Sequence, residues 1–406
     1  MSSKIKNTAA KEEAKYAPVP KLRFPEFRDA TGWKQTPLGD CLDYQQPTPY
    51  LVADTQYSPA YKTPVLTAGK TFILGYTDEQ HGIFSAGLPV IIFDDFTTAT
   101  QFVDFPFKAK SSAMKILEAR NGADIKFMYE TLQTLSYEVG AHERHWISNF
   151  AAMLLPVPKP AEQKKIAECL SSVDALMAAQ TRKVAALKTH KKGLMQQLFP
   201  REGETQPRLR FPEFQNAGEW KLRKAGTFFA NRVTKGEEGL PIYSVTMHDG
   251  MIKRDSFDRN FYDIEEAKGN KKVCKGDIAY NMMRMWQGAL GVAPEDCLVS
   301  PAYIVLAPMK DTVPVFFQYL FKLPDSLLLL TSHSRGLTKD RLRLYYDDFA
   351  SIALRSPAPL EQRRIATYLC SLDALINAET QKLEAFKAHK KGLMQQLFPS
   401  PEDAAA

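Results

Sequence analysis

Residues 162–200 read EQKKIAECLSSVDALMAAQTRKVAALKTHKKGLMQQLFP, and residues 361–399 read EQRRIATYLCSLDALINAETQKLEAFKAHKKGLMQQLFP. The two stretches align without a gap at an offset of 199 residues (361 minus 162), and 25 of their 39 positions are identical. Identity of this extent indicates a duplicated element. Because a duplicated segment repeats one structural unit, this pair of stretches decides the architecture of the chain.

Seam positions in both copies follow one another at alternating intervals of four and three, and they are apolar except for Gln180 and Lys191 in the first copy and Glu379 and Lys390 in the second. This average period of 3.5 is typical of a coiled-coil seam. The seam positions are Ile166, Leu170, Val173, Met177, Val184, Leu187, Leu194 and Leu198 in the first copy and Ile365, Leu369, Leu372, Ile376, Leu383, Phe386, Leu393 and Leu397 in the second. We expect two helices of about 35 residues, roughly 50 Å long, that pack antiparallel on each other. The alternative is two amphipathic helices packed on separate domains.

A second repeat precedes each variable region. Residues 22–27 and residues 209–214 both read LRFPEF, and Trp33 and Trp220 follow at the same spacing. The variable segments, 34–158 and 221–357, resemble each other little. We therefore predict one repeated frame that carries two different domains. The predicted boundaries are a tail at 1–19, a domain at 20–158, a helix at 159–200, a linker at 201–219, a domain at 220–357, a helix at 358–399 and a tail at 400–406.

Short β-like runs alternate with turn residues in both variable segments. The expected strands are 63–66, 71–74 and 90–93 in the first segment and 241–245, 278–281 and 303–306 in the second. Helices are expected at 125–135 and 315–322. The fold class predicted from these patterns is α/β (α+β), with two domains, two long antiparallel coiled-coil helices and an internal pseudo-two-fold repeat.

The composition is that of a globular protein with a moderately basic balance. The chain is 44% hydrophobic and 24% charged, with a net charge of +7 and a pI near 8.9. This charge is compatible with nucleic-acid binding. The sequence lacks an apolar run long enough for a membrane helix, and residues 1–15 lack the apolar centre of a secretory signal. The five cysteines are scattered and odd in number, so we expect reduced thiols and a cytoplasmic location.

Polar and aromatic residues gather at loop-like places, most densely just before each long helix. Gln and Arg pair with base edges, while Lys, Ser and Thr suit phosphates. Each residue alone could be an ordinary surface group. The DNA-contact candidates are Gln45, Gln46, Thr48, Tyr50, Thr97, Thr98, Lys110, Ser111, His142, Arg144, His145, Trp146, Arg284, Gln287, Ser334, Arg335, Lys339, Arg341 and Arg343.

The sequence lacks the usual catalytic signatures. It has no phosphate-binding loop G-x-x-x-x-G-K-[ST], no G-x-G-x-x-G turn and no G-x-S-x-G elbow. It also lacks the [N/D]-P-P-[F/Y/W] motif of amino-methyltransferases. Histidines 142 and 145 stand without the residues that usually complete a zinc site. We therefore predict no catalytic residue and no metal site in this chain.

The helical copies also carry basic runs, at 182–183, 188–192 and 387–391. Three interpretations remain open: a solvated helix face, a contact with DNA phosphates, and a contact with an acidic partner subunit.

The order of these motifs resembles that of type I restriction-modification specificity subunits. The motifs that show the resemblance are LRFPEF followed by Trp, a variable domain, P-x-P-x-EQ-x-x-I at 158–166 and 357–365, and GLMQQLFP, and each occurs twice. Within the variable segments, PVLTAGKTFILGYT (64–77), IIFDDFTTA (91–99), KAKSSAMK (108–115), KGDIAYNMMRM (275–285) and SPAYIVL (300–306) also resemble target-recognition domains of that family. The resemblance covers nearly the whole chain beyond residue 20.

The resemblance implies a subunit that catalyses nothing itself and reads a bipartite, asymmetric site on double-stranded DNA. Each variable domain would read one half, and the helices would set the gap. Two methyltransferase subunits would dock on the duplicated helices and bring S-adenosylmethionine, and restriction/translocase subunits would bring ATP and Mg²⁺. The helix residues expected to serve the coiled coil and subunit binding are Ile166, Leu170, Val173, Leu187, Leu194, Leu198, Ile365, Leu369, Leu372, Phe386, Leu393 and Leu397.

Two other function classes remain open on the residues alone. One is a coiled-coil scaffold without DNA readout, which would lack salt-dependent DNA affinity. The other is an enzyme such as a nuclease or a solitary methyltransferase, which would show turnover by the purified chain.

Overall fold

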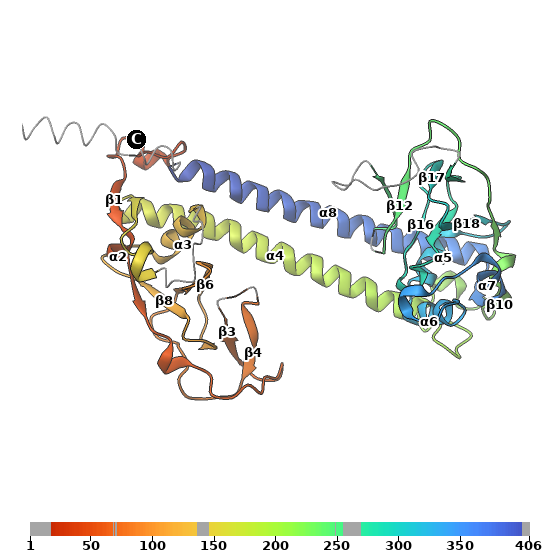
Figure 1. Ribbon diagram of the computed structural model, residues 1–406, viewed down its shortest axis with the longest axis horizontal. Helices are drawn as coiled ribbons and strands as arrows, with labels where there is room; N and C mark the ends of the chain where they lie inside the picture. Colours follow the sequence, from red (N-terminus) through yellow and green to blue (C-terminus); the bar gives the residue numbers. More distant parts are fainter. Residues whose placement is uncertain are drawn as a thin grey trace, which may run out of the picture. The chain divides into compact units, whose positions relative to one another are not determined.

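The computed structural model describes residues 18–67, 69, 71–135, 146–247, 249–254 and 269–399. The chain divides into two compact units: Met1–Thr181 with Gln381–Ala406, and Arg182–Thr380. Each unit therefore holds one variable region, the first part of the long helix that follows it, and the last part of the other long helix (Figure 1). The predicted boundaries instead set each long helix apart as a segment of its own.

The first unit contains a four-stranded antiparallel sheet in the order β2–β8–β5–β6. The central strand β5 is buried at all five residues because its sequence, VIIFD, is nearly all apolar. Helix α3 (Ile125–Thr134) packs against this sheet and begins at Asp124, whose carboxylate accepts a hydrogen bond from the Phe127 amide. The strands are β2 (Leu42–Gln45), β5 (Val90–Asp94), β6 (Thr100–Val103) and β8 (Met114–Ala119).

Two smaller sheets complete the first unit. Strand β3 lies between β4, which runs antiparallel to it, and β7, which runs parallel. Strands β1 and β9 pair antiparallel at the junction with the long helix. The bounds are β1 (Lys34–Pro37), β3 (Thr63–Leu66), β4 (Ile73–Thr77), β7 (Lys108–Ala109) and β9 (Leu154–Val157), with short helices at η1 (Pro25–Phe27), α2 (Leu38–Cys41), η2 (Thr48–Tyr50) and η3 (Trp146–Phe150).

The second unit repeats this plan with a different sequence. Its four-stranded sheet has the order β11–β18–β15–β16, and three strand pairs, β10–β19, β12–β13 and β14–β17, surround it. The bounds are β10 (Lys221–Lys224), β11 (Phe229–Asn231), β12 (Tyr243–Val245), β13 (Met251–Lys253), β14 (Lys271–Val273), β15 (Ile278–Asn281), β16 (Leu290–Val292), β17 (Cys297–Val299), β18 (Tyr303–Pro308) and β19 (Ala353–Ser356), with η4 (Pro212–Phe214), η5 (Ala225–Thr227), η8 (Met285–Gln287) and η9 (Lys339–Arg341).

The helices of the second variable region agree only partly with the prediction. Helix α5 (Pro314–Phe321) matches the expected helix at 315–322 and buries three phenylalanines. Helices α6 (Pro324–Ser332) and α7 (Tyr346–Ser351) were not expected. The α6 sequence, PDSLLLLTS, places four leucines in a row, so it lacks the helical period that identifies an amphipathic helix.

The two long helices, α4 (Pro160–Leu198) and α8 (Pro359–Leu397), are continuous over 39 residues each, slightly longer than expected (Figure 1). Within each unit they run antiparallel. In the first unit Leu397 packs in one cluster with Ile166, and in the second Leu198 packs in one cluster with Ile365. The predicted seam residues are buried or half-buried throughout. The coiled-coil prediction is confirmed.

Charged residues interrupt the apolar seam at matching places. In the first unit, the Lys390 ammonium lies 2.8 Å from Asp174 and 2.9 Å from Glu130, and Lys126 lies 2.7 Å from Asp174 and 2.6 Å from Glu130. In the second unit, Lys191 pairs with Asp373, whose other oxygen accepts a hydrogen bond from the Tyr319 hydroxyl.

These contacts change the pKa values of the groups involved. Burial raises the pKa of Asp174, but hydrogen bonds from Lys126 and Lys390 outweigh it and hold the pKa below its ordinary value. Burial lowers the pKa of Lys390, but its hydrogen bonds to Asp174 and Glu130 leave the pKa above its ordinary value. Lys191 of the basic run at 188–192 and Lys390 of the run at 387–391 are therefore already used in ion pairs within the protein.

The EQ pair that begins each long helix ties the helix to its variable region. The Arg23 guanidinium donates two hydrogen bonds of 2.7 Å to Glu162, and the Trp33 indole donates a third to the same carboxylate. The next side chain, Gln163, accepts from the Asp124 amide and donates to the Pro158 carbonyl. Glu162 and Gln163 are buried, so these bonds satisfy polar groups that would otherwise be costly.

The same set of contacts between an arginine, a tryptophan and the glutamate of the EQ pair, here called the Arg–Glu–Trp node, recurs in the second unit. Arg210 donates two hydrogen bonds of 2.7 Å to Glu361, and Trp220 donates to the same carboxylate. Gln362 accepts from the Val313 amide and donates to the Pro357 carbonyl. The LRFPEF segment, the tryptophan and the EQ pair therefore form one structural device, which occurs twice.

The end of the other long helix closes each unit. In the first unit, Phe398 lies 6.1 Å from Trp33 and 5.4 Å from Phe127 between ring centroids. In the second unit, Phe199 lies 6.1 Å from Trp220 and 5.3 Å from Phe316. The amides of Leu22 and Leu209 donate to the Gln396 and Gln197 carbonyls respectively. The duplicated residues thus make duplicated contacts.

The substitution Glu361→Gln should destabilise the chain strongly, because it leaves the buried Arg210 guanidinium without its counter-charge. We expect the free energy of unfolding to fall by about 3 kcal/mol, measured by urea denaturation. Glu213→Gln is the matched control, because the Glu213–Arg364 pair is about half exposed on both sides and should contribute no more than about 1 kcal/mol. Equal losses in the two variants would refute the structural role of the node.

Asp174→Asn should change the acid limb of the stability curve. A carboxylate whose folded pKa is lowered stabilises the fold above its unfolded pKa, and that contribution disappears as the pH falls through the folded pKa. The variant should therefore be less stable than the wild type at pH 7, and the difference should shrink below about pH 4. Urea midpoints across this range measure it, and a difference independent of pH would contradict the assignment.

Candidate nucleic-acid interface and subunit groove

The basic stretch before the second long helix forms a hairpin in the second unit. The backbone amides of Arg335 and Arg343 each donate to the carbonyl of the other residue at 2.9 Å. Arg335, Lys339, Arg341 and Arg343 are all exposed. The arrangement presents four cations on one short segment, which suits an anionic ligand such as a nucleic-acid backbone.

The hairpin is anchored to the core of the second unit at its base. Arg335 forms an ion pair of 2.6 Å with Asp348 of α7. The Leu344 amide donates to the Met282 carbonyl at 3.0 Å, and the Tyr280 hydroxyl donates to the Leu344 carbonyl at 3.2 Å. The base of the hairpin is therefore held by β15 and by α7.

The Met282 contact also brings a second predicted stretch to the hairpin. Arg284, two residues after Met282, is exposed and donates to the Gln287 amide oxygen at 3.2 Å. Met282 and Leu344, which are 62 positions apart in the sequence (344 minus 282), are thus joined by a hydrogen bond. Ser334 differs from the rest, because its hydroxyl donates to the Leu330 carbonyl of α6 at 2.8 Å.

Predicted residues of the first unit lie at two places on its sheets. The Gln45 amide donates to the Tyr50 hydroxyl at 3.2 Å, and both line a hollow of about 470 Å³ together with Tyr44 and Glu118. Gln46 and Thr48 are exposed beside this hollow. Thr97 and Thr98 form the turn between β5 and β6, where Asp94 accepts the amide hydrogens of Phe96 and Thr97.

A lysine and a tyrosine form a further surface feature that the sequence did not suggest. The Lys110 ammonium lies 5.9 Å from the centre of the Tyr57 ring. The neighbouring Ser111 hydroxyl accepts the Ala113 amide. Aromatic rings beside cations can stack on bases. Tyr57 gave no signal because it lies between Gln56 and Ser58, outside the polar clusters from which the candidates were chosen.

The candidates that precede the first long helix have different outcomes. His142, Arg144 and His145 lie outside the described residues. Trp146 is buried, its ring lies 5.3 Å from that of Phe93, and its amide donates to the Asp95 carboxylate at 3.0 Å. Its ring belongs to the core and is not presented on the surface, so Trp146 cannot contact DNA in this conformation.

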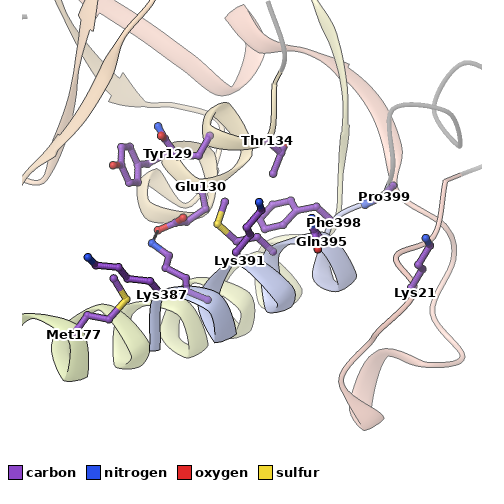
Figure 2. A pocket seen from close by; sticks show the side chains of 13 residues that line it. Lys21, Tyr129, Glu130, Thr134, Met177, Lys387, Lys391, Gln395, Phe398 and Pro399 are labelled. Atoms are coloured by element: carbon purple, nitrogen blue, oxygen red, sulfur yellow. Dashed lines mark hydrogen bonds and ion pairs between the residues drawn. The ribbon is translucent and has the colours of Figure 1, made fainter. Parts of the chain in front are cut away.

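A groove of about 830 Å³ lies in the first unit along α3 and the last turns of α8. Figure 2 shows Tyr129 and Glu130 projecting from α3 toward this helix. Met177, Met394 and Phe398 supply apolar lining, and Lys21, Lys387, Lys390 and Lys391 supply cations. An apolar groove with a cationic rim is suited to an amphipathic segment with acidic side chains.

The described part of the chain offers little for metal chemistry. Across those residues, no group of three His, Cys, Asp or Glu side chains could hold a metal ion. The five cysteines are free thiols. Burial raises the pKa of Cys297 to about 12, so this thiol stays protonated and unreactive. In the same part of the chain, every helix is too short or too polar to cross a membrane.

Comparisons with known proteins give the family. The chain is 43% identical over 373 residues to the type I restriction enzyme EcoR124I/EcoR124II specificity subunit of Escherichia coli, covering 86% of this chain and 88% of that protein. It is 24% identical over 262 residues to a putative type I restriction enzyme MjaX specificity subunit of Methanocaldococcus jannaschii, covering 60% of this chain and 58% of that protein.

A crystal structure supports the fold. The S subunit of a type I restriction-modification system from M. genitalium matches 94% of this chain and 99% of that chain with a TM-score of 0.63 at 16% identity. No protein-family model matches the sequence. At 43% identity over most of both proteins, the chain belongs to the type I restriction enzyme specificity subunits, which are non-catalytic components of their restriction-modification complexes.

Proposed function

We propose that this specificity subunit reads a bipartite, asymmetric site on double-stranded DNA, with one half read by each variable region. The observation that carries the proposal is the basic hairpin of the second unit, which presents four exposed cations and is anchored to Met282, two residues before Arg284. The Arg–Glu–Trp node is repeated in both units, whereas the loops that the units carry differ. One frame with two different surfaces is suited to two different half-sites.

The side-chain chemistry suggests how each surface would act. Arg284, Arg341 and Arg343 can pair with guanine edges in the major groove, while Lys339 suits a phosphate. In the first unit, Gln45 and Gln46 can pair with adenine, and Lys110 with Tyr57 offers a cation beside an aromatic ring. We expect the length of α4 and α8 to determine the number of base pairs between the two halves.

We further propose that two methyltransferase subunits dock on the duplicated helices, and that restriction/translocase subunits complete the assembly. S-adenosylmethionine, ATP and Mg²⁺ would be bound by these partners, which would flip the target adenine out of the duplex. The groove between α3 and α8 supports a docking role, because Lys387 and Lys391 line it beside Met394. The five free thiols are compatible with a cytoplasmic complex.

The proposal is tested by mapping adenine methylation in the host genome with and without this chain. A split motif with modified adenine in both halves, lost on deletion of the chain and restored by its expression, is the expected result. If the partner complex forms but no split motif depends on this chain, the subunit is a scaffold without DNA readout.

The double substitution Lys339→Ala with Arg341→Ala should weaken DNA binding by the assembled complex. Each lost phosphate contact should reduce the slope of log K against log salt by about 0.9, as measured by fluorescence anisotropy of a labelled duplex. Lys310→Ala is the control, because Lys310 follows β18 at the end where Leu306 pairs with Ile278, away from Met282 and the hairpin. An unchanged slope in the double variant would remove the hairpin from the interface.

Charge reversal in the groove should weaken assembly. Lys387→Glu with Lys391→Glu would repel an acidic partner segment, and we expect less methyltransferase subunit to co-elute with the variant in size-exclusion chromatography. Lys382→Glu is the control, because Lys382 is exposed on α8 outside the groove lining. Normal assembly of the double variant would mean that the partner docks elsewhere.

A further inference from the structure

The tip of the basic hairpin carries an apolar side chain in full contact with solvent. Leu337 is 98% exposed, whereas the next most exposed large hydrophobic side chains in the described ranges reach 70%. Removing a leucine side chain from water is favourable. A leucine held at the end of a cationic projection is therefore suited to a partner that is anionic outside and apolar inside.

The backbone fixes the position of this leucine. Gly336 has a φ of +151°, and a Cβ at that position would lie 2.5 Å from the Arg341 carbonyl oxygen. Only glycine permits this close approach. Beyond the tip, the Arg341 amide donates to the Thr338 carbonyl at 2.9 Å. The turn is thus closed by its own backbone and anchored through Arg335 to Asp348.

The flanking charges identify the partner. Arg335, Lys339, Arg341 and Arg343 flank Leu337 along the segment, and the acidic residues nearest in sequence are Asp340, Asp347 and Asp348, of which Asp348 already pairs with Arg335. A protein partner with an apolar pocket would also have to be strongly acidic around it. Duplex DNA meets both requirements, because its phosphates are anionic and the faces of its stacked bases are apolar.

We propose that Leu337 is a wedge that enters the base stack of the half-site read by the second unit. Apolar side chains inserted between base pairs partly unstack them and kink the duplex. Pyrimidine–purine steps unstack most easily, so the wedge would add selectivity for a flexible step without a hydrogen bond to any base. This inference rests on the proposed DNA-reading function and specifies one mechanical part of it.

The test uses the complex of this chain with its methyltransferase subunits and duplexes that carry its split methylation motif. The adenine analogue 2-aminopurine, placed in turn along the half-site read by the second unit, fluoresces more strongly when it is unstacked. The target adenine, which we propose is flipped out by the methyltransferase subunit, would also be unstacked and is therefore not substituted. At the other positions we expect a several-fold rise at one step with the wild type, no rise with Leu337→Ala, and recovery with Leu337→Phe. Affinity should fall about tenfold in Leu337→Ala, while its salt slope stays unchanged because no cation is lost.

Two controls separate the outcomes. Leu328→Ala removes another highly exposed leucine of the same unit, on α6, and should change neither fluorescence nor affinity. If the wild type binds the duplex with salt dependence but 2-aminopurine stays quenched at every position other than the target adenine, the wedge is overturned and DNA reading stands. A duplex with uracil in place of thymine lacks the thymine methyl group. If the wild type binds this duplex as weakly as Leu337→Ala binds the thymine duplex, and 2-aminopurine shows no unstacking, Leu337 contacts a thymine methyl and the wedge is overturned. If the wild type shows no salt-dependent binding, the proposed function itself fails.

Discussion

The buried ion pair between the arginine of each LRFPEF segment and the glutamate that begins each long helix is the contact on which the structure depends. Arg23 with Glu162, and Arg210 with Glu361, join the start of a variable region to the start of the helix that follows it. Charges buried to this extent are tolerated only when they are paired and fully hydrogen-bonded. The tryptophan indole and two backbone carbonyls meet that condition in both units.

The duplication also repeats a backbone hydrogen bond between each LRFPEF segment and the last turn of a long helix. In the second unit, the LRFPEF segment begins 11 residues after the last residue of α4 (209 minus 198), and the Leu209 amide donates to the Gln197 carbonyl. In the first unit the same contact joins the first LRFPEF segment to the last turn of α8, because the Leu22 amide donates to the Gln396 carbonyl. Two equivalent frames result, and each can change its exposed loops without changing the contacts that hold it together.

The features that could be predicted from the sequence are those with a period or a repeat. The coiled-coil seam follows from the 3.5-residue spacing, and strands such as β5 and β15 follow from short apolar runs. The ion-pair nodes could not be predicted, since Arg23 and Glu162 are 139 residues apart. Trp146 looked like a surface residue because it follows a polar cluster, yet its ring packs on Phe93. The hairpin could be predicted as a cationic stretch, but not as a folded projection with Leu337 at its tip.

If one repeated frame carries two independent DNA readers, one reader can be exchanged without changing the other. The most direct test replaces residues 34–158 with the corresponding segment of a relative that has a different specificity, and then maps adenine methylation in the host genome. Because only the first variable region is exchanged, we expect a new split motif in which one half changes while the other half and the gap stay the same. A motif altered in both halves, or not altered at all, would contradict it.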